Sequence, residues 1–302
     1  MNTENMNMLT RRRSLALLAT LAAGGGRVRA QEGAVLRAEL ERAYAAWLQA
    51  MRTKDTAAFA ASTSRYRQMC LRNEVVSMRQ PWPAAVFKSV IQVPDISRLT
   101  FLQATATGDT ARVIYFGRVD FALDAGTTPE NPLILRFLKE NGAWKFDWIQ
   151  YVNFGNDDAA RAEAKSGGQN WLRGEEFQMT GRYPAVPAPC KEPYQIAALQ
   201  ILATSCKVTV NINQGAHIET VENNTGNRFI TGGLQKGYNL ISITPVANLK
   251  ATNPPMLEVQ ILTRREAYTK PVKAWAWKPP EAPAQWKPKY DTSVFVKSRS
   301  TL

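Results

Sequence analysis

The sequence is poor in the residues from which most metal and catalytic sites are built. Its 302 residues include one histidine, His217, and three cysteines, Cys70, Cys190 and Cys206. These are too few soft ligands for a zinc cluster or an iron–sulfur centre, and they offer little for a Ser-His-Asp machinery. We therefore expect neither a metal nor a cofactor, and the sequence points to no particular reaction.

Long hydrophobic runs are also missing. A membrane-spanning helix needs roughly 18 to 20 consecutive apolar residues, and the apolar run over residues 15–23 is much shorter. It follows Arg11-Arg12-Arg13 and precedes a Val-Arg-Ala ending, an order typical of a signal peptide. The arginines resemble the twin-arginine type. The alternative is a basic amphipathic helix of a cytosolic protein. We expect residues 1–30 to be a signal peptide and the mature chain to be soluble, in the periplasm or secreted.

Acidic residues are few towards the C-terminus, where residues 191–302 hold 14 basic and 7 acidic side chains of a chain with net charge +13. Tryptophans, lysines and prolines interleave there, which favours an extended arm. Such an arm fits an anionic glycan, a membrane surface or a protein partner, whereas nucleic acid is not expected for an exported protein. The alternative is that the tryptophans complete a core and the tail covers a sheet edge. The candidate surface-binding residues are Trp275, Trp277, Lys278, Trp286 and Lys287.

The first third of the chain shows a helical period. Apolar residues recur every three or four positions over 34–51, as in an amphipathic helix. Asp55 or Thr56 can cap a second short helix over 57–61. Residues 73–90 favour a helix in part, with a break near Gln80 because prolines follow it.

Beyond the helices, β-favouring residues alternate with a period of two, as in β-strands. Residues 98–123 predict a hairpin that turns at Gly108-Asp109, and residues 133–154 predict another that turns at Asn141-Gly142. Helices followed by an antiparallel meander predict an α+β domain over 31–155, whose curved sheet packs on the N-terminal helices.

The same region resembles the NTF2-like superfamily, in its SnoaL-like or DUF4440-like branch. The resemblance covers roughly residues 34–155. It rests on Ala45 to Met51 with Lys54, Asp55 and Phe59, and on the closing hairpin from Leu135 to Trp148. It implies a cone whose sheet encloses a cavity. Relatives use this cone as isomerases, dehydratases or cyclases, for ligand binding, or to form dimers.

Enzymatic relatives generally place Asp, His, Tyr or Arg inside the cone, where an apolar wall can tune a carboxylate as a general base. Arg118 and Asp120 alternate on one strand face and, with Tyr115, are the catalytic candidates; the alternative is that this face points to solvent. Asp147 alternates with aromatic residues, so we expect it to be exposed. The candidate ligand-binding residues are Trp47, Phe116, Arg118, Trp144 and Trp148.

Short strand-like runs at regular spacing over residues 196–277 predict an all-β sandwich, of a generic immunoglobulin-like or jelly-roll kind. We expect residues 156–195 to connect the two domains through a short helix and a Pro-rich linker, and residues 278–302 to form the basic tail. In an oxidising compartment Cys190 and Cys206 are a candidate disulfide, with free thiols as the alternative. His217 with Glu219 is half a metal site at best, so a surface histidine is expected.

These observations predict an exported, non-catalytic binding or interaction protein. Its NTF2-like domain holds a small apolar or amphipathic molecule or mediates formation of a homodimer, and its sandwich contacts a second partner. Two alternatives stay open at this point. One is a SnoaL-like isomerase, dehydratase or cyclase, and the other is binding of cell-surface glycan through the sandwich and the tail.

Overall fold

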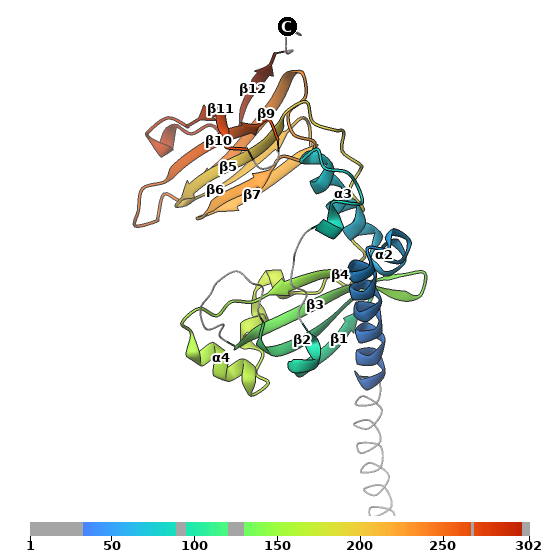
Figure 1. The fold of residues 1–302 in the computed structure, drawn as a ribbon. Helices are drawn as coiled ribbons and strands as arrows, with labels where there is room; N and C mark the ends of the chain where they lie inside the picture. The colour runs from blue at the N-terminus through green and yellow to red at the C-terminus, as the bar shows by residue number, and fades with distance from the viewer. Residues whose placement is uncertain (1–32, 89–94, 120–129, 267–268, 298–302) are drawn as a thin grey trace, which may run out of the picture. The chain divides into compact units, whose positions relative to one another are not determined.

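The computed structural model describes residues 33–297 except 89–94, 120–129 and 267–268 (Figure 1). The predicted signal peptide and Asp120 lie outside these residues. The chain forms two compact units, and each is built from two separate stretches of the sequence. The first contains the described residues up to 67 and from 95 to 185, and the second contains residues 68–88 and 186–297.

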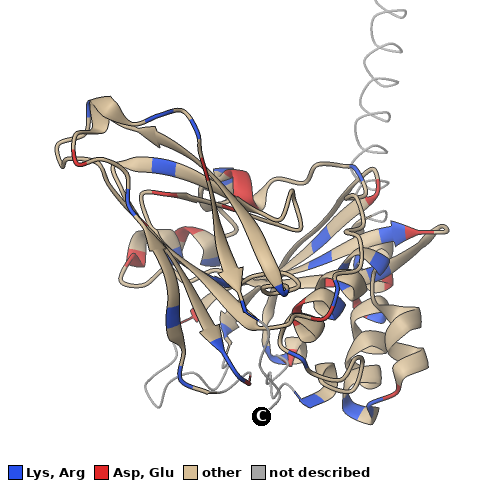
Figure 2. Cartoon of the chain, turned by 90° about the horizontal axis from the view of Figure 1, so that it is seen from above, with Lys and Arg blue, Asp and Glu red and all other residues tan. Residues whose placement is uncertain are grey.

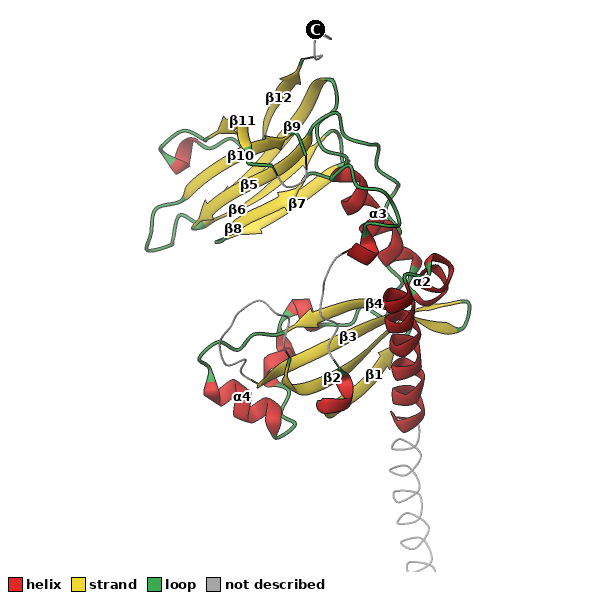
Figure 3. Cartoon of the chain, in the orientation of Figure 1, coloured by secondary structure: helices red, strands yellow, loops and turns green. Residues whose placement is uncertain are grey.

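The first unit is α+β, as predicted: N-terminal helices contact a four-stranded antiparallel sheet of order β1-β2-β3-β4 (Figure 3). Residues 33–53 are helical and form α1. The other elements of this unit are α2 (Thr56–Ser62), the 3-10 turn η2 (Ile96–Arg98), β1 (Thr100–Thr107), β2 (Thr110–Arg118), β3 (Glu130–Glu140), β4 (Ala143–Tyr151), α4 (Asp158–Lys165) and the 3-10 turns η3 (Asn170–Arg173) and η4 (Glu175–Phe177).

Aromatic side chains join α1 to one face of this sheet. The rings of Trp47 and Phe146 stack with centroids 4.1 Å apart, and Tyr44 lies 5.6 Å from Phe146. Asp55 caps α2, because its carboxylate accepts hydrogen bonds from the N–H groups of Ala57 and Ala58 at 2.9 and 3.0 Å. The predicted first helix, second helix and both hairpins are present, which confirms the predicted order of elements.

Helix α3 (Arg65–Ser77) begins earlier than the predicted residue 73 and ends before Gln80. Ser64 supplies an N-cap that the sequence pattern did not predict, since its Oγ accepts a hydrogen bond from the N–H of Arg67 at 3.0 Å. The boundary between the two units falls within this helix, after Arg67.

The second unit consists mainly of two four-stranded antiparallel sheets, of order β11-β10-β5-β8 and β12-β9-β6-β7. One hydrophobic core contains side chains from both sheets, including Ile201, Val259, Val210 and Ile243. The all-β C-terminal region is thus confirmed. Besides most of α3, this unit holds the 3-10 turns η1 (Val86–Lys88) and η5 (Pro283–Gln285) and the strands β5 (Ile196–Thr204), β6 (Cys206–Ile212), β7 (His217–Glu222), β8 (Thr225–Phe229), β9 (Gly237–Ala247), β10 (Met256–Arg264), β11 (Val272–Trp277) and β12 (Tyr290–Val296).

Strand β12 comes from the segment that was expected to be a basic tail. It pairs antiparallel with β9 over its whole length, from Tyr290 opposite Ile243 to Val296 opposite Gly237. Val294 and Val296 belong to the hydrophobic core of the unit. The C-terminal segment therefore completes the second sheet.

Two residues of α3, Asn73 and Ser77, form hydrogen bonds with residues 188–190 and 232 of the second unit. Asn73 is buried; its amide donates to the carbonyl of Ala188 at 2.9 Å and accepts from the N–H of Cys190 at 2.8 Å. Ser77 Oγ accepts from the N–H of Gly232 at 2.7 Å. A segment from the first third of the sequence is thus built into the C-terminal unit.

Among the residues that the structure describes, no helix has both the length and the apolar character required to cross a membrane. Lys and Arg residues are spread over both units rather than gathered on one element (Figure 2).

Candidate functional site

The face of the first sheet opposite α1 carries a line of four side chains that includes two arginines. Thr105, Arg112, Arg136 and Trp148 are successive register partners across β1, β2, β3 and β4. Side chains directly opposite on neighbouring strands lie about 5 Å apart at Cβ. We call these four residues the arginine row, and it places two guanidinium groups side by side on one face of the sheet.

Both arginines find neutral partners. Arg112 donates to the carbonyl oxygen of Phe177 at 2.7 Å. Arg136 donates to Gln150 Oε1 at 2.9 Å from Nε and 2.6 Å from Nη2, and also to the carbonyl oxygen of Glu176. Within the described part of the chain, neither guanidinium has a carboxylate oxygen within ion-pairing distance.

Burial and mutual repulsion act on these groups. Loss of hydration lowers the pKa of Arg112 below its usual value, and the neighbouring charge of Arg136 lowers it further. Burial also lowers the pKa of Arg136, although the negative charge of Asp147 opposes this effect. Both groups stay protonated at neutral pH, since arginine ionises far above it. The sheet therefore holds two positive charges in a partly desolvated place.

An apolar cluster adjoins the row on the same face of the sheet. Ile114 and Ile134 are register partners, each two residues from an arginine of the row, and they are almost fully buried. They pack with Leu172 and Phe177, and Leu102, Val152 and Trp171 lie against them. We call these seven residues the outer-face cluster. The face is amphipathic, with cations along one line and apolar side chains beside it.

The segment 169–178 covers this face. It supplies Leu172 and Phe177 to the cluster and the carbonyl groups that the arginines bind. Local hydrogen bonds also shape this segment: Trp171 Nε1 donates to the carbonyl of Gly168 at 2.9 Å, and Gln178 Nε2 donates to that of Leu172 at 2.9 Å. We call residues 169–178 the cover. The sequence predicted only a connector for this stretch.

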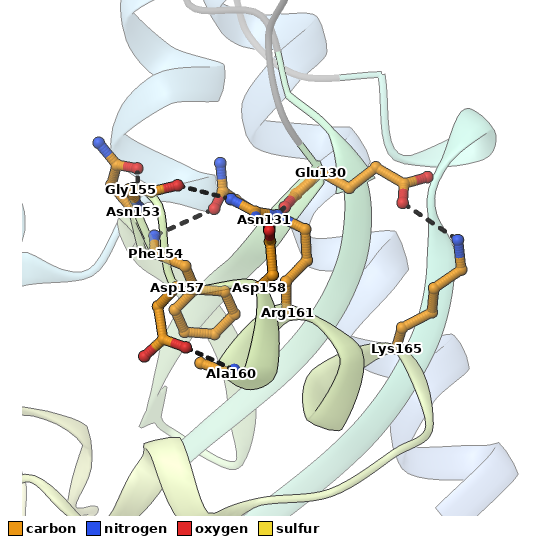
Figure 4. Close-up of polar contacts among 10 residues, drawn as sticks. All are labelled: Glu130, Asn131, Asn153, Phe154, Gly155, Asp157, Asp158, Ala160, Arg161 and Lys165. Carbon is orange, nitrogen blue, oxygen red and sulfur yellow. Dashed lines mark hydrogen bonds and ion pairs between the residues drawn. The ribbon is translucent and has the colours of Figure 1, made fainter.

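A polar network fixes α4, the helix before the cover, to the start of β3 (Figure 4). Arg161 donates to the carbonyls of Glu130 at 2.9 Å and Gly155 at 2.8 Å. Asn131 is fully buried and its Oδ1 accepts from the N–H of Phe154 at 3.1 Å. Lys165 pairs with the Glu130 carboxylate at 3.2 Å. These contacts hold the N-terminal end of the cover in place.

One end of the row meets the N-terminus of α3. The Arg67 guanidinium lies 3.8 Å from the ring centroid of Trp148, a cation–π contact. Ser64 Oγ donates to Asp147 Oδ1 at 2.5 Å. Burial raises the pKa of Asp147, against the lowering effects of the Ser64 hydrogen bond and of the charges on Arg67 and Arg136.

Asp147 and Trp148 correct an expectation drawn from strict alternation. A register shift falls between Arg136 and Phe137, where Phe137 pairs with Phe146 and Arg136 pairs with Trp148. The extra residue, Asp147, is half-buried rather than exposed, whereas Trp148 is 45% exposed. A β-bulge of this kind exchanges the faces on which the following residues lie.

The other predicted site residues of the first unit lie apart. Tyr115 is buried against α1 and donates to Glu41, which pairs with Arg37 at 2.8 Å; burial raises the tyrosine pKa. Trp47 and Phe116 are buried, Trp144 is half-buried below the Lys139 ammonium, and Arg118 is exposed. Of the predicted residues, only Trp148 belongs to the arginine row.

The predicted tail residues lie beside the second core. Trp275 and Trp277 in β11 and Trp286 after it are partly buried against that core, whereas Lys278 and Lys287 are exposed. The Trp277 and Tyr290 rings are 4.8 Å apart. Lys278 pairs with Glu258 at 3.0 Å.

The cysteines and the histidine of the second unit have local partners. Cys190 and Cys206 are free thiols: the sulfur of Cys190 lies 3.8 Å from Ser77 Oγ, and that of Cys206 donates to the carbonyl of Met256 at 3.4 Å. His217 is buried, with 7% of its surface exposed, rather than on the surface as expected. It faces the core side of β7, where its Nδ1 lies 3.3 Å from both the backbone nitrogen and the hydroxyl of Thr231.

Comparison with known proteins identifies no relative: no family model, no curated protein and no solved structure matches this chain. The sequence did contain a signal for the arginine row, because each arginine stands between apolar residues: Arg112 between Ala111 and Val113, and Arg136 between Leu135 and Phe137. Only the register of β2 against β3 brings these two positions together.

Proposed function

We propose that this chain is an exported, non-catalytic binding protein whose first unit, an NTF2-like domain, holds a small amphipathic molecule. The binding place that we assign is the sheet face between the arginine row and the cover. The observation that supports the proposal is the amphipathic character of this face, on which Arg112 and Arg136 adjoin the apolar outer-face cluster. Ligand sites in proteins combine apolar walls with a few convergent polar groups in the same way.

Native mass spectrometry of the protein, purified without detergent, tests the proposal directly. We expect a bound small molecule, which denaturing extraction releases for identification. The uncharged fluorophore N-phenyl-1-naphthylamine gives a second measurement, because it becomes bright in apolar sites and carries no charge that the arginines would select. We expect it to bind the protein as one molecule per chain.

Matched variants locate the binding place. Leu102 is partly buried against the outer-face cluster, whereas Leu249 is 67% exposed in the second unit. We expect Leu102→Asn to weaken binding of the fluorophore about tenfold, a change of about 1.4 kcal/mol, and Leu249→Asn to leave it unchanged. A protein that retains no molecule and does not bind the fluorophore would contradict the proposal.

A second candidate function, glycan binding, is supported by an aromatic pair on the second unit. Tyr238 and Phe295 are register partners on β9 and β12, with ring centroids 4.8 Å apart, and they are 72% and 52% exposed. Leu240 beside them is 49% exposed. Exposed aromatic faces suit stacking against sugar rings. This pair is a better candidate than the tail tryptophans, which are partly buried.

Pull-down of the protein by insoluble cell-wall polysaccharide tests this candidate. We expect Tyr238→Ser to abolish the pull-down and Met256→Ser, at another exposed position, to preserve it. Equal pull-down of both variants and the unaltered protein would remove the aromatic pair from the function. Truncation after Lys270 is unsuitable as a test, because it would remove one edge strand from each sheet of the second unit: β11 from one and β12 from the other.

A further inference from the structure

We infer that the molecule held by the first unit is an amphipathic anion, whose carboxylate or phosphate group binds between Arg112 and Arg136 of the arginine row while its apolar part lies against the outer-face cluster. This inference rests on the proposed binding function and names the chemistry of the ligand. It follows from three features of the row: its charge, its unmet hydrogen-bonding groups and its spacing.

The charge of the row is not balanced by direct contacts within the described residues. Arg112 and Arg136 contact carbonyl oxygens of the cover and the amide of Gln150, all of which are neutral. Two neighbouring, partly desolvated cations without a paired anion are costly to a fold. An anionic group between them would remove that cost, because hydrogen bonds between ionised partners are about twice as strong as neutral ones.

Buried polar atoms without a hydrogen-bond partner among the described residues lie at and beside the arginine row. Arg112 Nε is buried and has no hydrogen-bond partner within the described residues, and the same holds for Thr105 Oγ1, on the register partner of Arg112. Gln103 Oε1, two residues before Thr105 on the same face of β1, is a third such atom. The arginine N–H and the threonine hydroxyl donate hydrogen bonds. Rotation of the Gln103 amide by 180° lets that group donate as well.

The spacing of the row suits a carboxylate or a phosphate. Guanidinium groups present their N–H donors as a planar fork that matches the oxygens of these anions. Two forks on directly paired residues of β2 and β3 can bind different oxygens of one anion. Ile114 and Ile134 lie two residues along from the arginines and are almost fully buried. An alkyl or ring portion attached to the anion would therefore reach the partly buried side chains of the outer-face cluster, Leu102, Val152 and Trp171.

The competing explanation is that the arginines only fasten the cover to the sheet, since each donates to a carbonyl group of residues 176–177. The two explanations differ in one measurable respect. Fastening alone gives no preference for an anionic ligand over a neutral ligand of the same length.

Displacement of N-phenyl-1-naphthylamine by decanoate and by decan-1-ol measures that preference. We expect decanoate to displace the fluorophore from the unaltered protein at a roughly tenfold lower concentration than decan-1-ol. Arg112→Gln should reduce the difference to about twofold or less, mainly by weakening decanoate. Arg98→Gln, at an exposed arginine just before β1, is the matched control and should keep the full preference.

Arg112→Gln also removes a hydrogen bond to the cover, so a second variant that leaves the cover's contacts intact is needed. Thr105→Val keeps the shape of the side chain and deletes only the hydroxyl. We expect it to weaken decanoate about fivefold, a change of about 1 kcal/mol, without changing decan-1-ol, because the hydroxyl donates a hydrogen bond to the anion and not to the alkyl chain. Thermal unfolding of each variant verifies that the fold is intact.

Equal displacement by decanoate and decan-1-ol in the unaltered protein would overturn the inference and leave the proposed function standing. The inference also fails if folded Arg112→Gln and Thr105→Val both retain the full preference. Failure of the fluorophore to bind, with no molecule retained in native mass spectrometry, would instead reject the proposed function itself.

Discussion

At the scale of single residues, burial decides what the titratable side chains can do. His217 follows a turn and lies beside a polar Glu219, which made it look like a surface residue. The structure buries it at the start of β7, and burial lowers its pKa because the charged imidazolium loses hydration. The backbone N–H of Thr231 points at Nδ1, so that nitrogen is the acceptor and the proton belongs on Nε2.

Titration of His217 gives the first prediction. The chain has one histidine, so its ring resonance in proton NMR is assigned without ambiguity. We expect the folded protein to show a pKa below the ordinary 6.5. The unfolded state then binds more protons, and the free energy of unfolding falls as the pH drops below about 6.5, by at most about 1.4 kcal/mol per pH unit.

The variant His217→Asn provides the control for this titration, because Asn can still accept from the Thr231 N–H but does not titrate. Denaturant unfolding of both proteins between pH 5 and pH 8, a range of about 1.5 units on each side of the histidine pKa, should show a weaker acid dependence for the variant. A histidine pKa at or above 6.5 in the folded protein would contradict the prediction.

Asp147 gives the second prediction. Its folded pKa is raised, so the folded state binds the proton more tightly than the unfolded state, and any stabilisation from that proton is lost as the pH rises through the folded pKa. At pH 7 the ionised carboxylate of Asp147 therefore destabilises the folded state. We expect Asp147→Asn to raise the midpoint of denaturant unfolding at pH 7, since Asn keeps an oxygen for Ser64 Oγ.

Substitution of Ser64, which donates this hydrogen bond, should have the opposite effect on stability. Ser64→Ala deletes both the hydrogen bond to Asp147 and the N-cap of α3, so we expect it to destabilise the protein by about 1 to 2 kcal/mol. An Asp147→Asn variant that is as unstable as Ser64→Ala would show that the charge of Asp147 is needed, contrary to the prediction.

At the scale of elements, local patterns predicted most helices and strands, and irregular positions caused the errors. Alternation failed at the bulge in β4, where one extra residue moved Trp148 to the face of Arg136. Strand β12 was missed because Pro283, Pro288 and the surrounding lysines have the composition of an extended tail. Its pairing with β9 depends on residues about 50 positions away, which no local pattern contains.

The third prediction concerns β12. Val294 is 8% exposed and belongs to the core, whereas the next residue, Phe295, points to the other face and is 52% exposed. We expect Val294→Ala to lower the free energy of unfolding by about 2 kcal/mol, because it leaves a cavity, and Phe295→Ser to change it by less than about 1 kcal/mol. Denaturant unfolding measures both changes. A larger loss of stability in Phe295→Ser than in Val294→Ala would contradict the prediction, because it would mean that Phe295 rather than Val294 packs in the core.

At the scale of the whole molecule, the compact units do not divide the sequence in order. Residues 68–88 lie early in the chain and yet belong to the C-terminal unit. Buried hydrogen bonds of Asn73 and Ser77 hold them against residues 188–190 and Gly232. A cut of the chain near residue 186 would therefore separate the second unit from part of its own structure.

The fourth prediction follows from this arrangement. We expect Asn73→Ala to destabilise the second unit by about 1 to 3 kcal/mol, because it leaves the carbonyl of Ala188 and the N–H of Cys190 without their buried partner. Hydrogen exchange should become faster over residues 188–194 and 230–235 and stay unchanged in β1 and β2. Glu74→Ala, at the exposed neighbouring position, is the control. Faster exchange confined to β1 and β2 would contradict the prediction.

The sequence by itself determined the order and type of most elements, because helical and strand periods, the Asp55 cap and the turns Gly108-Asp109 and Asn141-Gly142 are local properties. It therefore determined an α+β region followed by an all-β region. Tertiary structure alone decided which residues meet. Register placed Arg112 beside Arg136, the bulge turned Trp148 to the same face, and long-range packing brought the cover, α3 and β12 to their sheets. These contacts join residues far apart in the chain, and their energies depend on burial, which a local pattern of residue types does not specify.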